Sequence, residues 1–374
     1  MNSKKRKEIK QIVTLCVCAA VIIALVIVYS IIQNNADAEG EDTEALPDVG
    51  ISGQFTIIDE DYTRITALSY DYINESLAFH VENSTWQLDG DAAFPVDQEK
   101  LIMMAQAISD YGGYRQMVYD STKDSAYGFD DPLYKISATY LEDDDTTAYT
   151  REYMIGNKNN LTGYYYFHVT GDTSVYMVND ALFTYFNYIK KDIFKADSLP
   201  APELDDIIDL TVDYNGTEQV LTPAEESDDT ADTADTDTQS PADPVAVIME
   251  ALTQKVKLSY DTQIDYDVTD ADVTEYGLDN PGLTLKLHYY DYEEVTTDTG
   301  ISSAKIQKET NFSLHFGKTA MLEREVKSMN GQTVTEQVEM VYVTVPGSSI
   351  VYAVEAAVLD TVKDAAGLGG PDSQ

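Results

Sequence analysis

The sequence predicts an α+β protein in which a single N-terminal transmembrane helix precedes two repeated modules, each made of an antiparallel β-sheet and one main helix. Three observations lead to this prediction: an apolar run without charged residues near the N-terminus, a six-residue motif that occurs twice, and alternating apolar and polar residues after each copy of the motif. The chain has 374 residues, so each module can be about 150 residues long and bury a core of its own.

The apolar run covers residues 12–32, where Val, Ile, Leu and Ala dominate and no side chain is charged. A helix of this length rises about 30 Å and can cross the hydrocarbon layer of a membrane. Basic residues are concentrated in residues 1–11, and the residues that follow the run are acidic. The positive-inside rule therefore predicts a cytoplasmic basic tail at 1–11, a single-pass helix in the cell membrane at 12–32, and an extracytoplasmic location for the bulk of the chain.

A cleaved signal peptide is the alternative to a retained anchor, because a basic head followed by an apolar stretch also describes secretion signals. Ala36-Asp37-Ala38 resembles a cleavage site, whereas the apolar run is longer than the usual signal core. The sequence leaves this choice open. Residues 33–54 are polar and acidic and contain proline and glycine, which predicts a flexible acidic tether before the first module.

The repeated motif reads Tyr-Gly-Phe-Asp-Asp-Pro at 127–132 and Tyr-Gly-Leu-Asp-Asn-Pro at 276–281. Further matches follow each copy in the same order: a hydrophobic residue before a glycine, and then a Val-Tyr-x-Val strand, at 155–156 and 175–178 and again at 316–317 and 351–354. Matches in a constant order indicate one supersecondary unit present twice. The sequence therefore predicts repeat module 1 at 55–195, repeat module 2 at 204–365 and a flexible tail at 366–374.

Each module contains one amphipathic helical pattern and several strand patterns. A helix is predicted at 98–111, capped by Asp97, and another at 244–256, capped by Asp243 and opened by Pro244. Period-two alternation predicts antiparallel strands at 65–70, 77–82, 86–88, 135–141, 149–155, 164–170 and 174–178 in module 1, and at 208–214, 218–221, 283–290, 311–316, 339–345 and 350–354 in module 2.

Three polar stretches of module 2 have no counterpart in module 1. Residues 222–241 are of low complexity and acidic, and they cannot bury enough apolar surface to order themselves. We therefore predict a disordered acidic loop at 222–241. The charged stretches 293–308 and 321–339 are predicted to be insertions between strands.

The motif residues predict structural roles. In each copy a glycine can supply a positive φ, an aspartate can bond its own backbone two residues on, and a proline forces the preceding residue into an extended conformation. The only tryptophan, Trp86, is predicted to anchor the core. The predicted structural residues are Trp86, Tyr127, Gly128, Asp130, Pro132, Tyr276, Gly277, Asp279 and Pro281.

No catalytic, cofactor-binding or metal-binding residue is predicted. The only cysteines lie at 16 and 18, the four histidines lack zinc-ligand spacing, and no phosphate loop or nucleophile elbow is present. His168 and His315 alternate with apolar or aromatic neighbours, which predicts surface-facing positions in strands. The acidic cluster 142–145 is predicted to be a solvated hairpin tip, and weak calcium association there stays a hypothesis. A net charge of −42 excludes nucleic acid as a partner.

The ordered series formed by Trp86-x-Leu, Pro95, the following helix, the Tyr-Gly-hydrophobic-Asp-x-Pro motif and Val-Tyr-x-Val resembles the bacterial family called domain of unknown function 4340. The likeness covers about 55–195 and, more loosely, 204–362. The resemblance implies a single-pass envelope protein with repeated domains, and some members are encoded beside ABC-type export or gliding-associated transporter components. It implies no catalytic residues.

Together these observations predict a non-catalytic accessory or scaffold protein, anchored in the membrane of a bacterial cell envelope and partnered by an envelope or ABC-type transporter protein. The alternative is an envelope protein that binds or hydrolyses glycan or peptide, which abundant carboxylates and aromatic residues favour. The sequence identifies neither the partner, nor the binding face, nor the oligomeric state.

Overall fold

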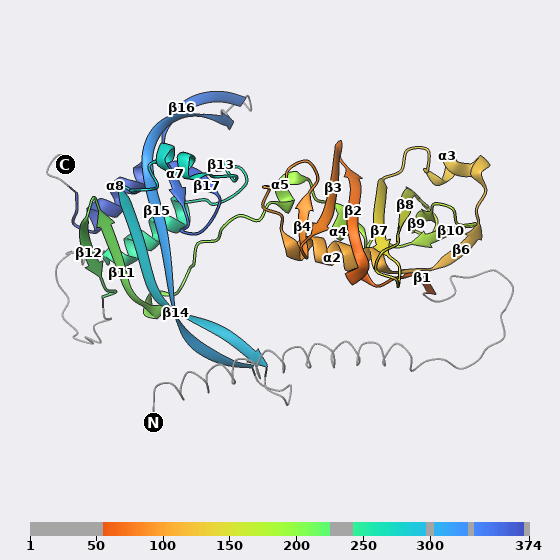
Figure 1. Ribbon diagram of the computed structural model, residues 1–374, viewed down its shortest axis with the longest axis horizontal. Helices are drawn as coiled ribbons and strands as arrows, with labels where there is room; N and C mark the ends of the chain where they lie inside the picture. The colour runs from red at the N-terminus through yellow and green to blue at the C-terminus, as the bar shows by residue number, and fades with distance from the viewer. Residues whose placement is uncertain (1–54, 225–241, 297–302, 328–332, 370–374) are drawn as a thin grey trace, which may run out of the picture. The chain divides into compact units, whose positions relative to one another are not determined.

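The computed structural model describes residues 55–224, 242–296, 303–327 and 333–369. Contacts divide the chain into two compact units. Residues 202–208 and 288–311 belong to one of them, and residues 55–201, 209–287 and 312–369 belong to the other. Most of the described structure is β-sheet, arranged in an eight-stranded sheet, a seven-stranded sheet and a two-stranded sheet (Figure 1).

The first sheet has eight strands in the order β4-β3-β2-β7-β8-β9-β10-β6, and every neighbouring pair is antiparallel. Two-residue turns with positive φ at Ile73-Asn74 and Asn83-Ser84 join its first three strands. The strands are β2 (Ile65–Tyr72), β3 (Glu75–Glu82), β4 (Thr85–Leu88), β6 (Arg115–Val118), β7 (Tyr134–Leu141), β8 (Ala148–Lys158), β9 (Tyr165–Val169) and β10 (Ser174–Val178).

Helix α2 (Gln98–Ser109) supplies the main helix of this first part. The Asp97 carboxylate accepts a hydrogen bond from the backbone N–H of Lys100 at 3.4 Å, and the helix buries Leu101, Met104, Ala105 and Ile108. The helix ends two residues before the predicted boundary. Residues Asp110–Gly113 form β5 instead, because they pair with β1 (Phe55–Asp59) in the two-stranded sheet.

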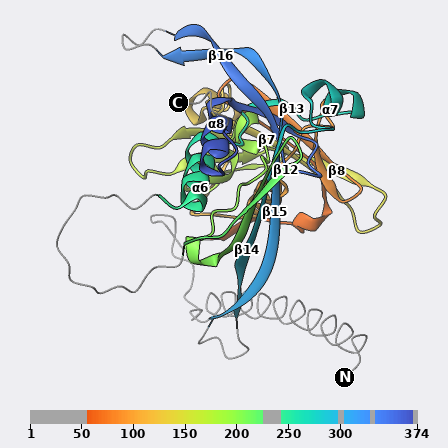
Figure 2. The same cartoon turned by 90° about the vertical axis from the view of Figure 1, so that its left-hand side faces the viewer.

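The second sheet has seven strands in the order β12-β11-β14-β15-β16-β17-β13. Its two longer helices, α6 (Pro244–Lys255) and α8 (Ala357–Ala365), pack side by side (Figures 1 and 2). The strands are β11 (Ile207–Tyr214), β12 (Thr217–Leu221), β13 (Gln263–Asp265), β14 (Leu283–Thr296), β15 (Ser303–Lys327), β16 (Thr333–Thr344) and β17 (Val351–Glu355).

Apart from the edge strand β4, the two sheets have the same strand order. In each sheet the first two strands form a hairpin, a main helix follows, and a three- or four-residue strand then becomes the far edge. Short helices, α3 (Asp124–Tyr127) and α7 (Asp270–Tyr276), precede the central strands β7 and β14. One chain thus contains two sheets of the same topology.

The stretches 293–308 and 321–339 are not loop insertions between strands as predicted. Their described residues lengthen the strands instead, since β14 runs to Thr296, β15 has 25 residues, and its ladder with β16 continues to the pair Lys327↔Thr333. Threonine and valine at 333–335 favour a strand, and exposed charged residues such as Glu323 and Glu339 suit its solvent-facing positions. The sheet therefore continues into long hairpins (Figure 1).

The predicted fold class is wrong in two respects. The structure is 46% strand and 22% helix, so it is mostly β rather than α+β. No helix in the described ranges is long and apolar enough to span a membrane. The longest of them, α2 and α6, have 12 residues each and rise only about 18 Å.

The predicted membrane anchor is corrected for the same reason. The predictions for 1–11, 12–32 and 33–54, and most of those for 222–241 and 366–374, fall outside the described residues. Because no membrane-spanning helix is found in the part that the structure describes, the transmembrane and single-pass assignments have no structural support. The predicted location, in the cell membrane with the bulk of the chain extracytoplasmic, depended on this anchor and therefore also has no structural support.

His315 on β15 makes the stability of the second sheet sensitive to pH. Burial lowers the pKa of His315, and the nearby Lys286 lowers it further. The unfolded chain therefore binds a proton more readily, so stability is present above the ordinary histidine pKa of about 6.5 and is lost as the pH falls below it.

We expect His315→Gln to remove this loss of stability at low pH. The urea midpoint of the wild type, measured at about pH 7.5 and about pH 5.5, should fall more than the midpoint of His315→Gln over the same interval. Carboxylates that titrate in both proteins cancel in this comparison. Equal falls would contradict the prediction.

Candidate functional site

The two Tyr-Gly motifs end the two short helices in the same way. Tyr127 is the last residue of α3 and Tyr276 the last residue of α7. Gly128 and Gly277 follow with φ of 82° and 71°, the left-handed conformation that favours glycine at a helix end.

A second pair of glycines lies against these helix ends. A Cβ added to Gly156 would lie 2.1 Å from the carbonyl oxygen of Tyr127, and one added to Gly317 would lie 2.2 Å from that of Tyr276. The sequence showed these glycines as repeated residues without giving them a role. Each allows a central strand to approach the backbone of the helix end, and this contact is present in both sheets.

The remaining motif residues lie around these contacts, and Pro132 also lines a surface hollow of about 360 Å³ beside the turn between β2 and β3. Asp130 and Asp279 are exposed. Asp279 accepts a hydrogen bond from the Thr274 hydroxyl at 3.4 Å rather than from its own backbone two residues on. Pro132 and Pro281 are half-buried ahead of β7 and β14. The motif thus supports the fold.

Trp86 belongs to the core of the first sheet, where 8% of it is exposed. The Gln98 side chain, at the start of α2, bonds both backbone groups of Trp86: the Trp86 N–H donates to Oε1 at 2.8 Å, and Nε2 donates to the Trp86 carbonyl at 2.9 Å. The amide of Gln98 therefore ties edge strand β4 to the main helix.

His168 is not surface-facing as predicted. It is 3% exposed, its Nδ1 lies 2.8 Å from the Ser174 carbonyl, and its ring stacks on Tyr119 at 4.2 Å. The segment that contains Tyr119 and Phe129 covers this face of the sheet, which alternation within one strand could not reveal. The histidine is a packed residue and no acid–base partner is within hydrogen-bond distance.

The acidic tip at 142–145 is a hydrogen-bonded turn. The Asp144 carboxylate accepts bonds from the Thr147 hydroxyl and from the backbone N–H groups of Thr147 and Thr146, and these bonds lower its pKa. Asp145 lies 3.0 Å from Arg64. No group of three metal-binding side chains occurs within the described ranges.

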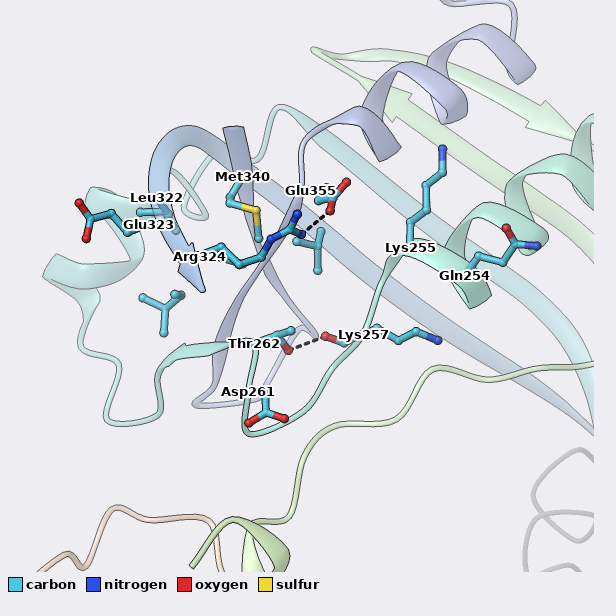
Figure 3. A pocket seen from close by; sticks show the side chains of 13 residues that line it. Gln254, Lys255, Lys257, Asp261, Thr262, Leu322, Glu323, Arg324, Met340 and Glu355 are labelled. Carbon is cyan, nitrogen blue, oxygen red and sulfur yellow. Dashed lines mark hydrogen bonds and ion pairs between the residues drawn. The ribbon is translucent and has the colours of Figure 1, made fainter. Parts of the chain in front are cut away.

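One hollow lies on the second sheet, where α6 ends and the β15–β16 hairpin leaves the sheet (Figure 3). We call it the β16 groove. Its volume is about 390 Å³, within the range of small-ligand and peptide pockets. Its lining residues are Gln254, Lys255, Lys257, Asp261, Thr262, Ile264, Leu322, Glu323, Arg324, Met340, Ala353, Val354 and Glu355.

A tight turn between α6 and β13 forms one wall of the groove. The Thr262 hydroxyl donates to the Lys257 carbonyl at 2.5 Å, which holds the turn closed before β13 pairs with β17 (Figure 3). Both lysine ammonium groups already have partners: Lys255 donates to Thr361 at 2.9 Å, and Lys257 donates to the Thr253 carbonyl at 3.0 Å. Both acceptors are neutral, so each lysine keeps its positive charge and has further N–H donors.

Arg324 on β15 is the central polar residue of the groove. Its guanidinium donates to Glu336 on the neighbouring strand at 2.8 Å. The second bond, to Glu355 at the end of β17, is drawn in Figure 3. The carboxylates of Glu336 and Glu355 raise the pKa of Arg324. Its Nε is buried and has no acceptor among the described residues. A buried donor without a partner costs about 1–3 kcal/mol. The Arg324 side chain as a whole is 41% exposed, so a ligand can contact its exposed part although not this Nε.

The polar side chains of the groove are an amide, carboxylates, ammonium groups, one hydroxyl and one guanidinium. The 13 lining residues include neither histidine nor cysteine. The only lining hydroxyl, that of Thr262, is engaged by backbone carbonyls at 2.5 and 3.2 Å, so no base activates it. Apolar side chains such as Ile264, Leu322 and Met340 supply contact surface beside the guanidinium. Such a combination suits recognition of a chain segment.

No motif or spacing in the sequence indicated this site. The groove joins residues 254–264, 322–324 and 353–355, which lie far apart in the chain, and Arg324 falls in a stretch interpreted as an insertion. A Thr-Val alternation at 333–335 was the only sequence feature that could have indicated a continued strand.

Comparison with known families gives one match. The family model described as a domain of unknown function, DUF4340, matches residues 86–281, from Trp86 to the proline of the second motif. A comparison with curated proteins found no match, and neither did one with solved structures. Since the family match covers more than half of the sequence, the chain belongs to the DUF4340 family.

Proposed function

We propose that this protein is a non-catalytic accessory or scaffold protein that holds a segment of a partner protein in the β16 groove. The observation that supports this proposal is the groove itself, which combines apolar contact surface and the partly exposed Arg324 side chain but lacks a nucleophile paired with a base. The family resemblance adds an expected partner class, a component of an ABC-type transporter.

We also propose that the two sheets are tandem copies of the family's domain. The shared strand order and the repeated approach of Gly156 and Gly317 to the two helix ends support this duplication. The family model matches one continuous range, 86–281, and does not itself divide the chain into two copies.

A photo-cross-linking residue at Ile264 tests the binding role. Ile264 lines the groove and is 43% exposed. Leu161, in the turn between β8 and β9 of the first sheet, is 96% exposed and provides the control position. In cells that express the full chain, we expect a single predominant partner protein to cross-link from position 264 and not from position 161.

Arg324→Gln should weaken this cross-link while the fold survives. The side chain is 41% exposed, and ion pairs at exposed sites contribute only about 0–1 kcal/mol to stability. A thermal melt serves as the fold control. Equal labelling from positions 264 and 161, or a cross-link that Arg324→Gln leaves unchanged, would count against the groove.

A second candidate function is binding or hydrolysis of a glycan, and a polar pocket of about 500 Å³ on the first sheet favours it. Glu60 accepts from Arg151 at 2.5 Å and from the Tyr149 hydroxyl at 2.8 Å, while Tyr153 and Asp172 complete the wall. Because Glu60 is held by both donors, it is poorly placed as a general base. Turnover of any substrate in a glycan and peptide panel, abolished by Glu60→Gln, would favour this candidate over the scaffold.

A further inference from the structure

We propose that the partner segment binds as an extended β-strand added to the open edge of β16, with a basic residue beside Glu336. This inference rests on the proposed function and specifies its partner and its geometry. Three features carry it: the unpaired length of β16, the ion cluster where β17 ends, and the charge around the edge.

The edge opens because β17 is shorter than its neighbour. β17 pairs with β16 only from Val343↔Tyr352 to Met340↔Glu355, and the Ala356 N–H then donates to the Glu339 carbonyl at 2.9 Å. Beyond this bond β16 continues to Thr333 and pairs with β15 alone among the described residues (Figure 1). Residues 333–338 thus present an unpaired edge about 20 Å long.

An unpaired strand edge is a template for one more strand. Its outward N–H and C=O groups can form the main-chain bonds by which many domains capture an extended peptide. A segment placed here would occupy the row that β17 leaves, and it would run directly over the β16 groove, since Glu355 ends that row and lines the groove. The strand row and the groove therefore form one site.

The side chains where β17 ends determine which charge a bound strand should carry. Arg324, Glu336 and Glu355 come from three adjacent strands and meet on one face, where two carboxylates surround one guanidinium. Both carboxylate side chains are about half exposed, at 44% and 50%. A lysine or arginine in the added strand would pair with Glu336 across the strands.

The surrounding charge favours a basic segment over a second copy of the chain. Exposed Glu323 and Glu339 flank the edge, and the chain carries a net charge of −42. Two copies paired edge to edge would bring like charges together, which destabilises cross-strand pairs. A segment of another protein that contains basic and β-branched residues can pair with the open edge and complement its negative charge.

Selection from random peptides of about nine residues, long enough to cover the edge, tests the chemistry without assuming a partner. The immobilised full chain should enrich peptides with Lys or Arg at alternate positions and Val, Ile or Thr between them, and it should deplete proline. Binding of a selected peptide should weaken about fivefold in Glu336→Gln, as expected for loss of a cross-strand ion pair. Glu309→Gln, an exposed glutamate earlier on β15, should leave it unchanged.

Proline tests the backbone pairing. Successive N–H groups of a strand point to opposite sides, so one of Val334→Pro and Thr335→Pro removes an open-edge donor and the other removes a donor facing β15. The open-edge variant should keep the wild-type melting temperature and lose peptide binding. If neither folded variant loses binding, strand addition is wrong.

The outcomes separate this inference from the proposed function. Selected peptides that are acidic or uncharged, or a dimer in sedimentation that a proline variant dissociates, would overturn the basic strand, whereas the groove cross-link from Ile264 would still support the scaffold. Absence of both selected peptides and the groove cross-link would overturn both proposals.

Discussion

Replacing Gly156 or Gly317 by alanine should destabilise the sheet that contains it by about 3 kcal/mol or more. The new Cβ would lie 2.1 Å from the Tyr127 carbonyl oxygen in the first sheet and 2.2 Å from the Tyr276 carbonyl oxygen in the second. Both obstacles are backbone atoms at a helix end, so no side chain can rotate away to relieve the overlap. The strand and the short helix would have to separate.

Gly282→Ala is the matched control, because the nearest atom to its added Cβ is 3.9 Å away. We expect it to change stability by no more than a few tenths of a kcal/mol. Chemical denaturation can be followed by the fluorescence of Trp86, the only tryptophan, which reports on the first sheet. Gly156→Ala should shift this transition, and Gly317→Ala should shift the transition seen by circular dichroism. If Gly156→Ala and Gly317→Ala lose no more stability than Gly282→Ala, the close approach of these glycines to the helix ends does not matter for the fold.

Trp86→Ala should cost about 3–5 kcal/mol, the usual range for a large aromatic residue removed from a core. Trp86 is 8% exposed on an edge strand that pairs only with β3, so few other contacts can close the cavity. Trp86→Phe keeps an aromatic ring and should lose much less. Thermal melting by circular dichroism measures both variants, since the fluorescent residue is absent.

Gln98→Ala separates the packing of Trp86 from the tie between its backbone and α2. It removes the amide that bonds both backbone groups of Trp86 and should cost about 1–2 kcal/mol. The aromatic side chain should therefore matter more than the tie. Trp86→Ala no more destabilising than Gln98→Ala would show that the indole contributes little.

The regular parts of the fold could be predicted because their signals are local. Period-two alternation located most strands of the two larger sheets, although the edge strands β6 and β13 were not predicted. The acidic caps Asp97 and Asp243 marked where α2 and α6 begin. Both caps accept backbone hydrogen bonds at the predicted helix starts. The prediction was wrong where a segment distant in the sequence determines the local structure. Residues 110–111 were predicted to end a helix, but they belong to β5 because they pair with β1.

The candidate site could not be predicted for the same reason. Its walls meet only after β13 pairs with β17 and β15 pairs with β16, and none of its residues belongs to a recurring motif. Charged residues such as Arg324 and Glu336 were interpreted as features of a loop, although their register in a strand pair places them opposite one another. The repeated glycines were visible, but their contact with a helix end depends on the tertiary fold.

The bare edge of β16 also governs the colloidal behaviour of the purified protein. Identical chains can polymerise through such an edge unless charge keeps them apart. Here the mutual repulsion of chains with a net charge of −42 gives that protection. Acid neutralises the carboxylates and concentrated salt screens them, so we expect the solution to stay monodisperse in neutral buffers of low ionic strength.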